Sequence, residues 1–154
     1  MHARIWYEPD GVVRITTFAP GIGDDDKLRA CSTLINDKRI HTQATWEDAE
    51  SLEHLRALLP ASRKFRDCWR QAPRGGVMVD LVRARTQRLV EIRAERDAAL
   101  AATDGLMLRA QETGQDTTQL LAERQRLRDL PAKAQADLDA FTTAEELEAY
   151  EVIR

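Results

Sequence analysis

The sequence is poor in the residues that build metal, redox and stacking sites. Of its 154 residues, two are cysteine and three are histidine, and aromatic side chains make up 5%. Cys31 and Cys68 are too few for a disulfide framework. No histidine or cysteine pair has the short spacing typical of metal ligands. We therefore expect buried thiols and surface histidines, with no metal site and no cofactor.

Long apolar runs are missing as well. No segment approaches the roughly 18 consecutive apolar residues that a membrane-spanning helix needs. The opening residues, Met1–Glu8, lack the apolar core of a secretion signal. We expect no membrane partner, synthesis in the cytoplasm and reduced thiols.

Catalytic motifs are also absent. The glycines at 21–23 and 75–76 are not followed by the residues of a phosphate-binding loop, and Asp24–Asp26 is typical of the first turn of a helix. A nucleophilic Cys68 has no histidine near it in the sequence. We expect no catalytic residue, and an enzyme is only the third hypothesis for this chain.

Charge is abundant but nearly balanced, with 23 basic and 26 acidic residues and a net charge of −3. A general nucleic-acid binder would normally carry a basic excess. The charge is uneven, because arginines gather between Arg83 and Arg96 while acids dominate after Ala132. This asymmetry predicts pairing within the chain or between subunits.

The N-terminal part, residues 1–72, predicts a small α+β region. Residues 4–8 and 12–18 are rich in strand-forming side chains and are joined by Pro9-Asp10-Gly11, which indicates a β-hairpin over 4–18. Alternation places Val13, Ile15 and Thr17 on one face of the second strand. We further expect a helix over 25–36, a strand over 38–43, a helical pattern from Trp46 to Leu59, and a polar segment over 62–70 in which Phe65 and Trp69 would share a face if it were helical.

The C-terminal part, residues 77–154, predicts a long antiparallel helical hairpin. One long helix is expected from Val79 to about Thr113, with Gly105 as a potential interruption and Gly114 at its end. A capping box from Asp116 to Gln119 indicates the next helix, and Pro131 is expected either to end that helix or to begin another. A second capping box starting at Thr142 opens a last short helix. The expected fold class is therefore α+β, with a hairpin region followed by a mostly helical half.

A leucine seam with arginines beside it runs along the long helix. Leu89 and Ile92 share a stripe with Arg85 and Arg96, and such arginines often pack their stems at helix–helix interfaces. We expect these four residues to contact a partner helix, which could also be residues 117–130 of the same chain. The alternative is a nucleic-acid-binding regulator that uses the arginine-rich helix 83–96, although a nucleic acid is not the partner we expect.

Several short motifs resemble those of small phage and prophage tail-region proteins. Lys64-Phe65-Arg66-Asp67-Cys68-Trp69-Arg70 is similar to a segment of that family, with Cys68 where alanine is usual. The family then has a long arginine-rich helix, as from Val79 to Asp97 here. Met107–Ala110, Gly114–Asp116 and Arg124–Pro131 resemble its later turn and ending, and Tyr7–Gly11 its opening hairpin.

This resemblance implies a tail-associated protein that acts in tail fibre or baseplate assembly. It implies partners among tail fibre or baseplate proteins, several copies of the chain in a homo-oligomer or around a tail, and a location in the virion tail or in the host cytoplasm during assembly. No catalytic residue carries over. The positions that it implies for structure or protein interface are Phe65, Arg66, Trp69 and Leu127–Pro131, which include Leu127, Arg128 and Leu130.

Overall fold

The computed structural model describes residues 1–152, and the predicted α+β fold is confirmed. The chain divides into two compact units, Met1–Asp80 and Leu81–Arg154. All the strands lie in the first unit and the long helices lie in the second.

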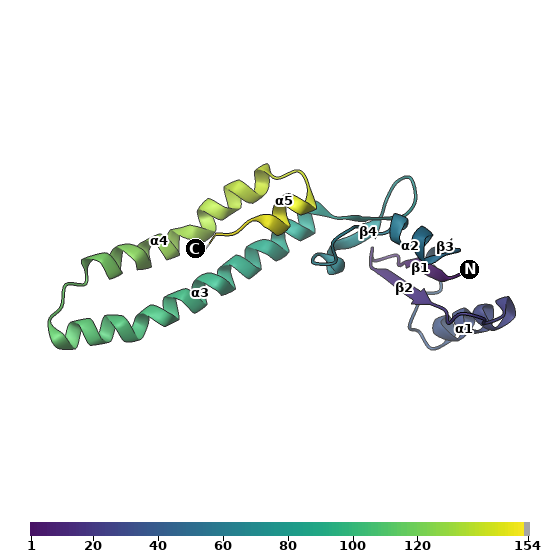
Figure 1. Ribbon diagram of the computed structural model, residues 1–154, viewed down its shortest axis with the longest axis horizontal. Coiled ribbons are helices and arrows are strands. Elements are labelled where there is room, and N and C mark those ends of the chain that lie inside the picture. Colours follow the sequence, from purple (N-terminus) through teal and green to yellow (C-terminus); the bar gives the residue numbers. More distant parts are fainter. Residues whose placement is uncertain (153–154) are drawn as a thin grey trace. The chain divides into compact units, whose positions relative to one another are not determined.

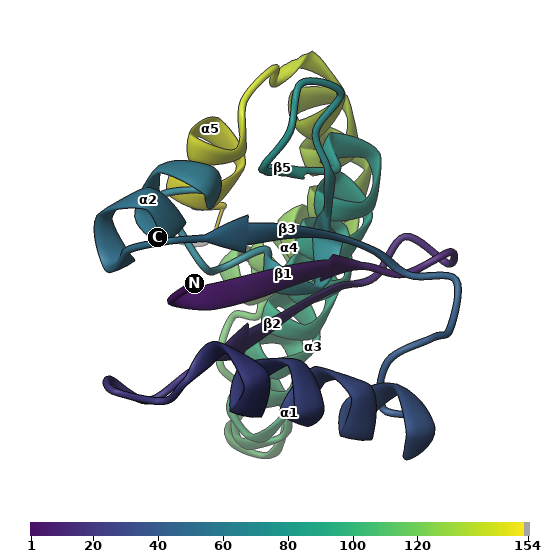
Figure 2. The same cartoon turned by 90° about the vertical axis from the view of Figure 1, so that its right-hand side faces the viewer.

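The first unit is built on a three-stranded antiparallel sheet (Figure 2). Strands β1 (Ala3–Tyr7) and β2 (Val13–Thr17) form the predicted hairpin, and β3 (Thr45–Ala49) pairs with the other side of β1. The strand order β2-β1-β3 puts β1 in the centre, where all five of its residues are buried.

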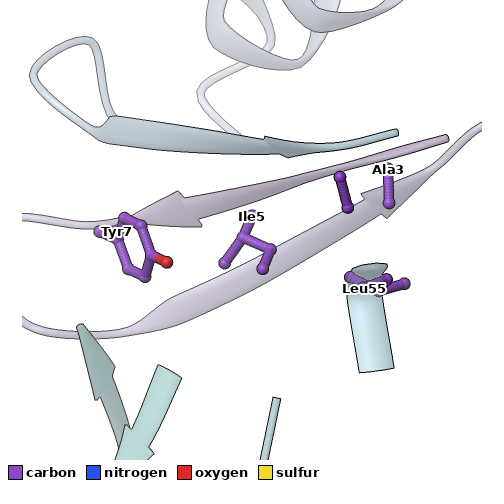
Figure 3. Close-up of a cluster of buried hydrophobic side chains, with 5 residues drawn as sticks. Ala3, Ile5, Tyr7 and Leu55 are labelled. Carbon is purple, nitrogen blue, oxygen red and sulfur yellow. The ribbon is translucent and has the colours of Figure 1, made fainter. Parts of the chain in front are cut away.

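The two faces of this sheet hold separate apolar clusters, since successive side chains of a strand point to opposite faces. Ala3, Ile5 and Tyr7 pack with Leu55 of helix α2 (Leu52–Leu58), as Figure 3 shows. Trp6 belongs to the other cluster, with Cys31 of helix α1 (Asp24–Asn36). The predicted helix over 25–36 and the predicted face of β2 are confirmed, because Val13 and Ile15 pack on the first cluster.

The third strand was misplaced by the sequence patterns. Residues 38–43 form a turn rather than a strand, and Trp46–Ala49 begins no helix but lies in β3. A contact between residues far apart in the sequence favours β3 at this position. The buried Arg4 of β1 donates hydrogen bonds to both carboxylate oxygens of Asp48 in β3, at 2.6 and 2.7 Å. Helix α2 starts later, where the hydroxyl of Ser51 accepts a hydrogen bond from the His54 amide.

A second, unpredicted β-hairpin follows. The segment containing Phe65 and Trp69 is not a helix that brings both side chains to one face, since a 3-10 turn (η1, Arg66–Cys68) leads into strand β4 (Trp69–Gln71). Strand β4 pairs with β5 (Val77–Val79). The turn between them contains Gly75 and Gly76, both with positive φ, so the Pro73–Gly76 segment joins two paired strands.

The second unit is the predicted helical hairpin (Figure 1). Helix α3 (Leu81–Thr113) runs without interruption through Gly105, and Gly114 takes a φ of 66° just after its end. Helix α4 (Thr118–Ala140) folds back along α3, and α5 (Ala144–Ala149) packs beside the start of α3.

Three details of the helix ends differ from the predictions. Pro131 lies inside α4, where it removes one backbone hydrogen bond but does not end the helix. The Asp116 capping box does not form, because α4 begins at Thr118 and the Asp116 carboxylate accepts from the amide and hydroxyl of Thr118 instead. The last capping box is one residue later than expected, with Thr143 and Glu146 as its members.

Gly76 generates a prediction about the first unit. A Cβ at Gly76 would lie 3.0 Å from the backbone oxygen of Leu58, whereas a Cβ at Gly11 would meet nothing, and both glycines have positive φ. Gly11→Ala should therefore cost about 1 kcal/mol of unfolding free energy from φ alone. Gly76→Ala should cost clearly more, because a backbone atom must move.

Urea unfolding followed by tryptophan fluorescence measures this difference. All three tryptophans lie in the first unit, so the signal reports that unit alone. Equal losses in the two variants would contradict the close approach of Gly76 to Leu58.

Candidate protein-binding surface on the helical hairpin

The hairpin is well packed only toward one end. We call residues 81–98 of α3, with the facing part of α4 and α5, the base, and residues 99–124 around the turn the tip. Ile92, Leu127, Leu138 and Leu147 in the base are at most 1% exposed. Within the tip, Ala110 is the one described residue that counts as buried. The apolar core therefore thins out toward the turn.

Two arginines attach α3 to the C-terminal segment at the base. Arg85 donates to the Phe141 carbonyl at 2.5 Å, and Arg88 donates to the Tyr150 carbonyl at 2.8 Å. Arg88 is 5% exposed and also bonds Glu91 and Glu95. Its burial disfavours the charge, but these carboxylates outweigh that cost and raise its pKa above the usual value.

The part of the tip nearest the base is joined by a polar contact. Arg124 of α4 donates to the Thr103 hydroxyl and to the Asp104 carboxylate, both at 2.6 Å. Its side chain is 17% exposed, whereas that of Asp104 is 66% exposed. This ion pair and hydrogen bond set the register of α4 against α3 where leucines no longer do so.

Beyond this contact the tip exposes large apolar side chains. Leu106 and Leu108 of α3 are 56% and 58% exposed, and Leu121 of α4 is 52% exposed. The Arg124–Asp104 contact places Leu121 and Leu106 at a similar level of the hairpin. Leu106 and Leu108 lie two positions apart on α3 and therefore point to different sides of the helix, so the tip presents exposed apolar area in more than one direction.

The residues predicted as an interface are distributed over both units. Those on the leucine seam are buried in the hairpin, those near residue 66 lie in the first unit, and the three predicted arginines of the second unit differ in their exposure and partners. Leu89, Ile92, Leu127 and Leu130 are buried in the second unit, Phe65 and Trp69 are buried in the first, Arg66 and Arg128 are exposed, Arg96 bonds Asp97, and Arg85 bonds Phe141.

The structure thus brings four of the predicted leucine and isoleucine positions together, within the chain. Their role in binding a partner stays a prediction, since a buried side chain offers little surface in this conformation. The exposed tip leucines were missed. The signal that could have found them is their position off the leucine stripe, close to the Gly114 turn.

The arginine-rich helix does not present a continuous cationic row. Arg88 is buried among Glu91 and Glu95, and Arg85 points its guanidinium at a backbone carbonyl. These two arginines stabilise the base of the hairpin, so they are not available to phosphates without opening it.

Arg88→Met should destabilise the hairpin by about 1–3 kcal/mol, because it removes buried charge-assisted hydrogen bonds while keeping an apolar stem. Thermal unfolding followed by far-ultraviolet circular dichroism measures the loss. Arg93→Met on the same helix is the matched control, since Arg93 is exposed and should change stability little. Similar losses from both substitutions would contradict the structural role of Arg88.

Tyr150 gives a pH-dependent prediction. Burial, followed by its hydrogen bond to Asp137, raises the pKa of Tyr150 from 10.0 to about 12, and burial likewise raises the pKa of Tyr7. A folded pKa above the unfolded one stabilises the fold below pH 10, and this contribution is lost as the pH rises from 10 to 12.

The two tyrosines of the chain should therefore ionise at higher pH in the folded protein than in urea. The ultraviolet absorbance of tyrosinate, recorded with circular dichroism at each pH, measures this. If the whole absorbance change is centred near pH 10 while the fold is intact, neither phenol has the raised pKa described here.

No group of three histidine, cysteine or acidic side chains within residues 1–152 could hold a metal ion. None of the helices described is both long enough and apolar enough to cross a bilayer.

Comparison with known proteins points to the hairpin. A search of curated proteins finds no match, and neither does a search of solved structures. Residues 89–142 match a family described as phage tail assembly chaperone protein. This stretch covers most of α3, the whole tip and all of α4. The match supports a role in tail assembly and confirms that this chain is similar to phage tail-region proteins through its helical hairpin.

Proposed function

We propose that this protein is an assembly chaperone that holds a tail fibre or baseplate protein through the tip of its helical hairpin. The observation that carries the proposal is the exposure of Leu106, Leu108 and Leu121 within the segment that matches the chaperone family. Leucines that are about half exposed in the free protein can bury apolar area on a partner.

The packing of the hairpin supports the same assignment. The base is joined by buried leucines and by Arg88, so it can act as a rigid support. The tip has little core of its own, and segments with few buried contacts open at low free-energy cost. An adaptable apolar tip on a rigid base suits a protein that binds its partner and later releases it.

The proposal includes no catalysis. The chaperone acts by covering apolar surface of the partner until the tail assembles, which requires no bond to be broken. Its place of action is the host cytoplasm during assembly. A permanent structural part of the virion would use the same surface, and purified tail particles distinguish the two roles by the presence or absence of this chain.

The test is binding to purified tail fibre and baseplate proteins, measured by light scattering of each mixture. Replacing Leu106, Leu108 and Leu121 together by serine should weaken the complex at least about tenfold, because truncating central apolar contacts of an interface has effects of that size. Circular dichroism should show that the helices remain, since these side chains are exposed.

The matched control replaces Val82 and Val90 by serine. These residues are 70% and 57% exposed but lie in the base, so binding should be unchanged. Equal weakening by both sets would contradict a site at the tip. A wild-type protein that ignores fibre and baseplate proteins alike would overturn the proposed partners. The same scattering data give the number of copies of the chain in solution.

A further inference from the structure

A second surface lies entirely in the first unit and does not involve the hairpin. A cleft of about 710 Å³ runs along β2 and is bordered by the end of α1, the following turn and the segment before β4. Five consecutive residues of the β1–β2 hairpin, Val12–Thr16, line it. Successive side chains of a strand point to opposite faces of the sheet, so consecutive residues can line one cleft only if the cleft lies along the edge of the strand. We call this cleft the β2 cleft.

The hydrogen-bond register shows which backbone groups face this edge. Phe18 donates to the His2 carbonyl, and Glu8 donates to the Val12 carbonyl. In an antiparallel pair the residues that exchange bonds alternate with residues that do not. The amides and carbonyls of Val13, Ile15 and Thr17 therefore point away from β1, and β2 has no other paired strand among the described residues.

The lining of the β2 cleft is cationic although the whole chain has a net charge of −3. Arg14, Lys38, Arg39 and Arg66 border it, against the single acid Asp67. Arg14 is paired with Glu8 at 3.0 Å. Within residues 1–152, no carboxylate forms an ion pair with Lys38, Arg39 or Arg66. The cleft therefore has an excess of positive charge that the first unit does not neutralise.

Apart from Thr16, the remaining lining is apolar. Val13, Ile15 and Ile40 contribute aliphatic surface, and the indole of Trp69 is 2% exposed. The indole N–H of Trp69 is buried and has no acceptor among the described residues, unlike that of Trp6, which donates to the Thr16 hydroxyl at 3.1 Å. Apolar surface between cations fits a strand whose side chains alternate between apolar and acidic.

We propose that the β2 cleft binds an extended, acidic segment of a partner protein, which adds to the sheet as a strand beside β2. Backbone bonds to Val13, Ile15 and Thr17 would hold the segment, and its carboxylates would pair with Lys38, Arg39 and Arg66. This mode of recognition takes affinity from main-chain bonds and specificity from alternate side chains. It is independent of the hairpin tip, so it stands or fails separately from the proposed chaperone site.

The first test uses a short fluorescent peptide in which glutamate and valine alternate, with a lysine–valine peptide as its control. Fluorescence anisotropy with the full chain should detect the acidic peptide alone, with an affinity that falls as salt rises. The double substitution Arg39→Glu and Arg66→Glu should weaken binding at least about tenfold, as expected for removing and reversing two interfacial charges.

Arg74→Glu is the charge-matched control for Arg39→Glu alone, because Arg74 is exposed in the β4–β5 turn and does not line the cleft. It should change the affinity less than about twofold. Equal effects of Arg74→Glu and Arg39→Glu would show a general charge effect and overturn the site.

Amide hydrogen exchange measured by NMR tests strand addition directly. The peptide should slow exchange at Val13, Ile15 and Thr17, whose amides face the edge. It should leave Arg14 and Thr16 unchanged, because their amides are already bonded to β1. Binding without this alternating protection would overturn strand addition, and no binding of either peptide would overturn the cleft as a peptide site. Scattering data that show a stable dimer, with these amides protected before any peptide is added, would assign the edge to a second copy of the chain instead.

Discussion

Arg4 lies in the central strand of the first unit, and its guanidinium can be buried there because Asp48 accepts two hydrogen bonds from it. The hydrogen bonds to Asp48 raise the pKa of Arg4 above its usual value, so the charge persists. The guanidinium also lies 5.4 Å from the ring centre of Trp6 and 5.1 Å from that of Trp46. A buried charge without such partners would be strongly unfavourable. The pair thereby favours β3 as the second strand beside β1, opposite β2.

The second unit depends on a different balance. Leucines and the buried Arg88 hold the base, whereas the Arg124–Asp104 pair holds the middle and little apolar contact holds the tip. Stability is therefore expected to fall along the hairpin from base to turn. Because the core is thin at the tip, Leu106 and Leu121 are exposed there, and both lie within the segment that matches the chaperone family.

The two proposed surfaces recognise different chemistry. The hairpin tip would bury apolar area on a folded or partly folded tail protein. The β2 cleft would take an extended acidic segment through main-chain bonds and cations.

The sequence by itself determined the parts of this protein that depend on local periodicity. The β1–β2 hairpin, helix α1 and the long α3–α4 hairpin follow from alternation, helical spacing and turn residues, and the resemblance to tail-region proteins follows from short motifs. Only the tertiary structure decided where β3 lies, because the Arg4–Asp48 pair joins residues 44 positions apart. It likewise decided that Pro131 stays inside α4, since the buried contacts of α4 outweigh one lost backbone bond.

The candidate site was predictable only in part for the same reason. A leucine seam has the same pattern whether it packs inside a monomer or against a partner, so Leu89 and Leu127 could not be assigned to a core from spacing. Their burial and the exposure of Leu106 and Leu121 depend on how α4 folds back on α3. The β2 cleft depends on strand order and on which backbone groups β1 already uses, and both are properties of the folded chain.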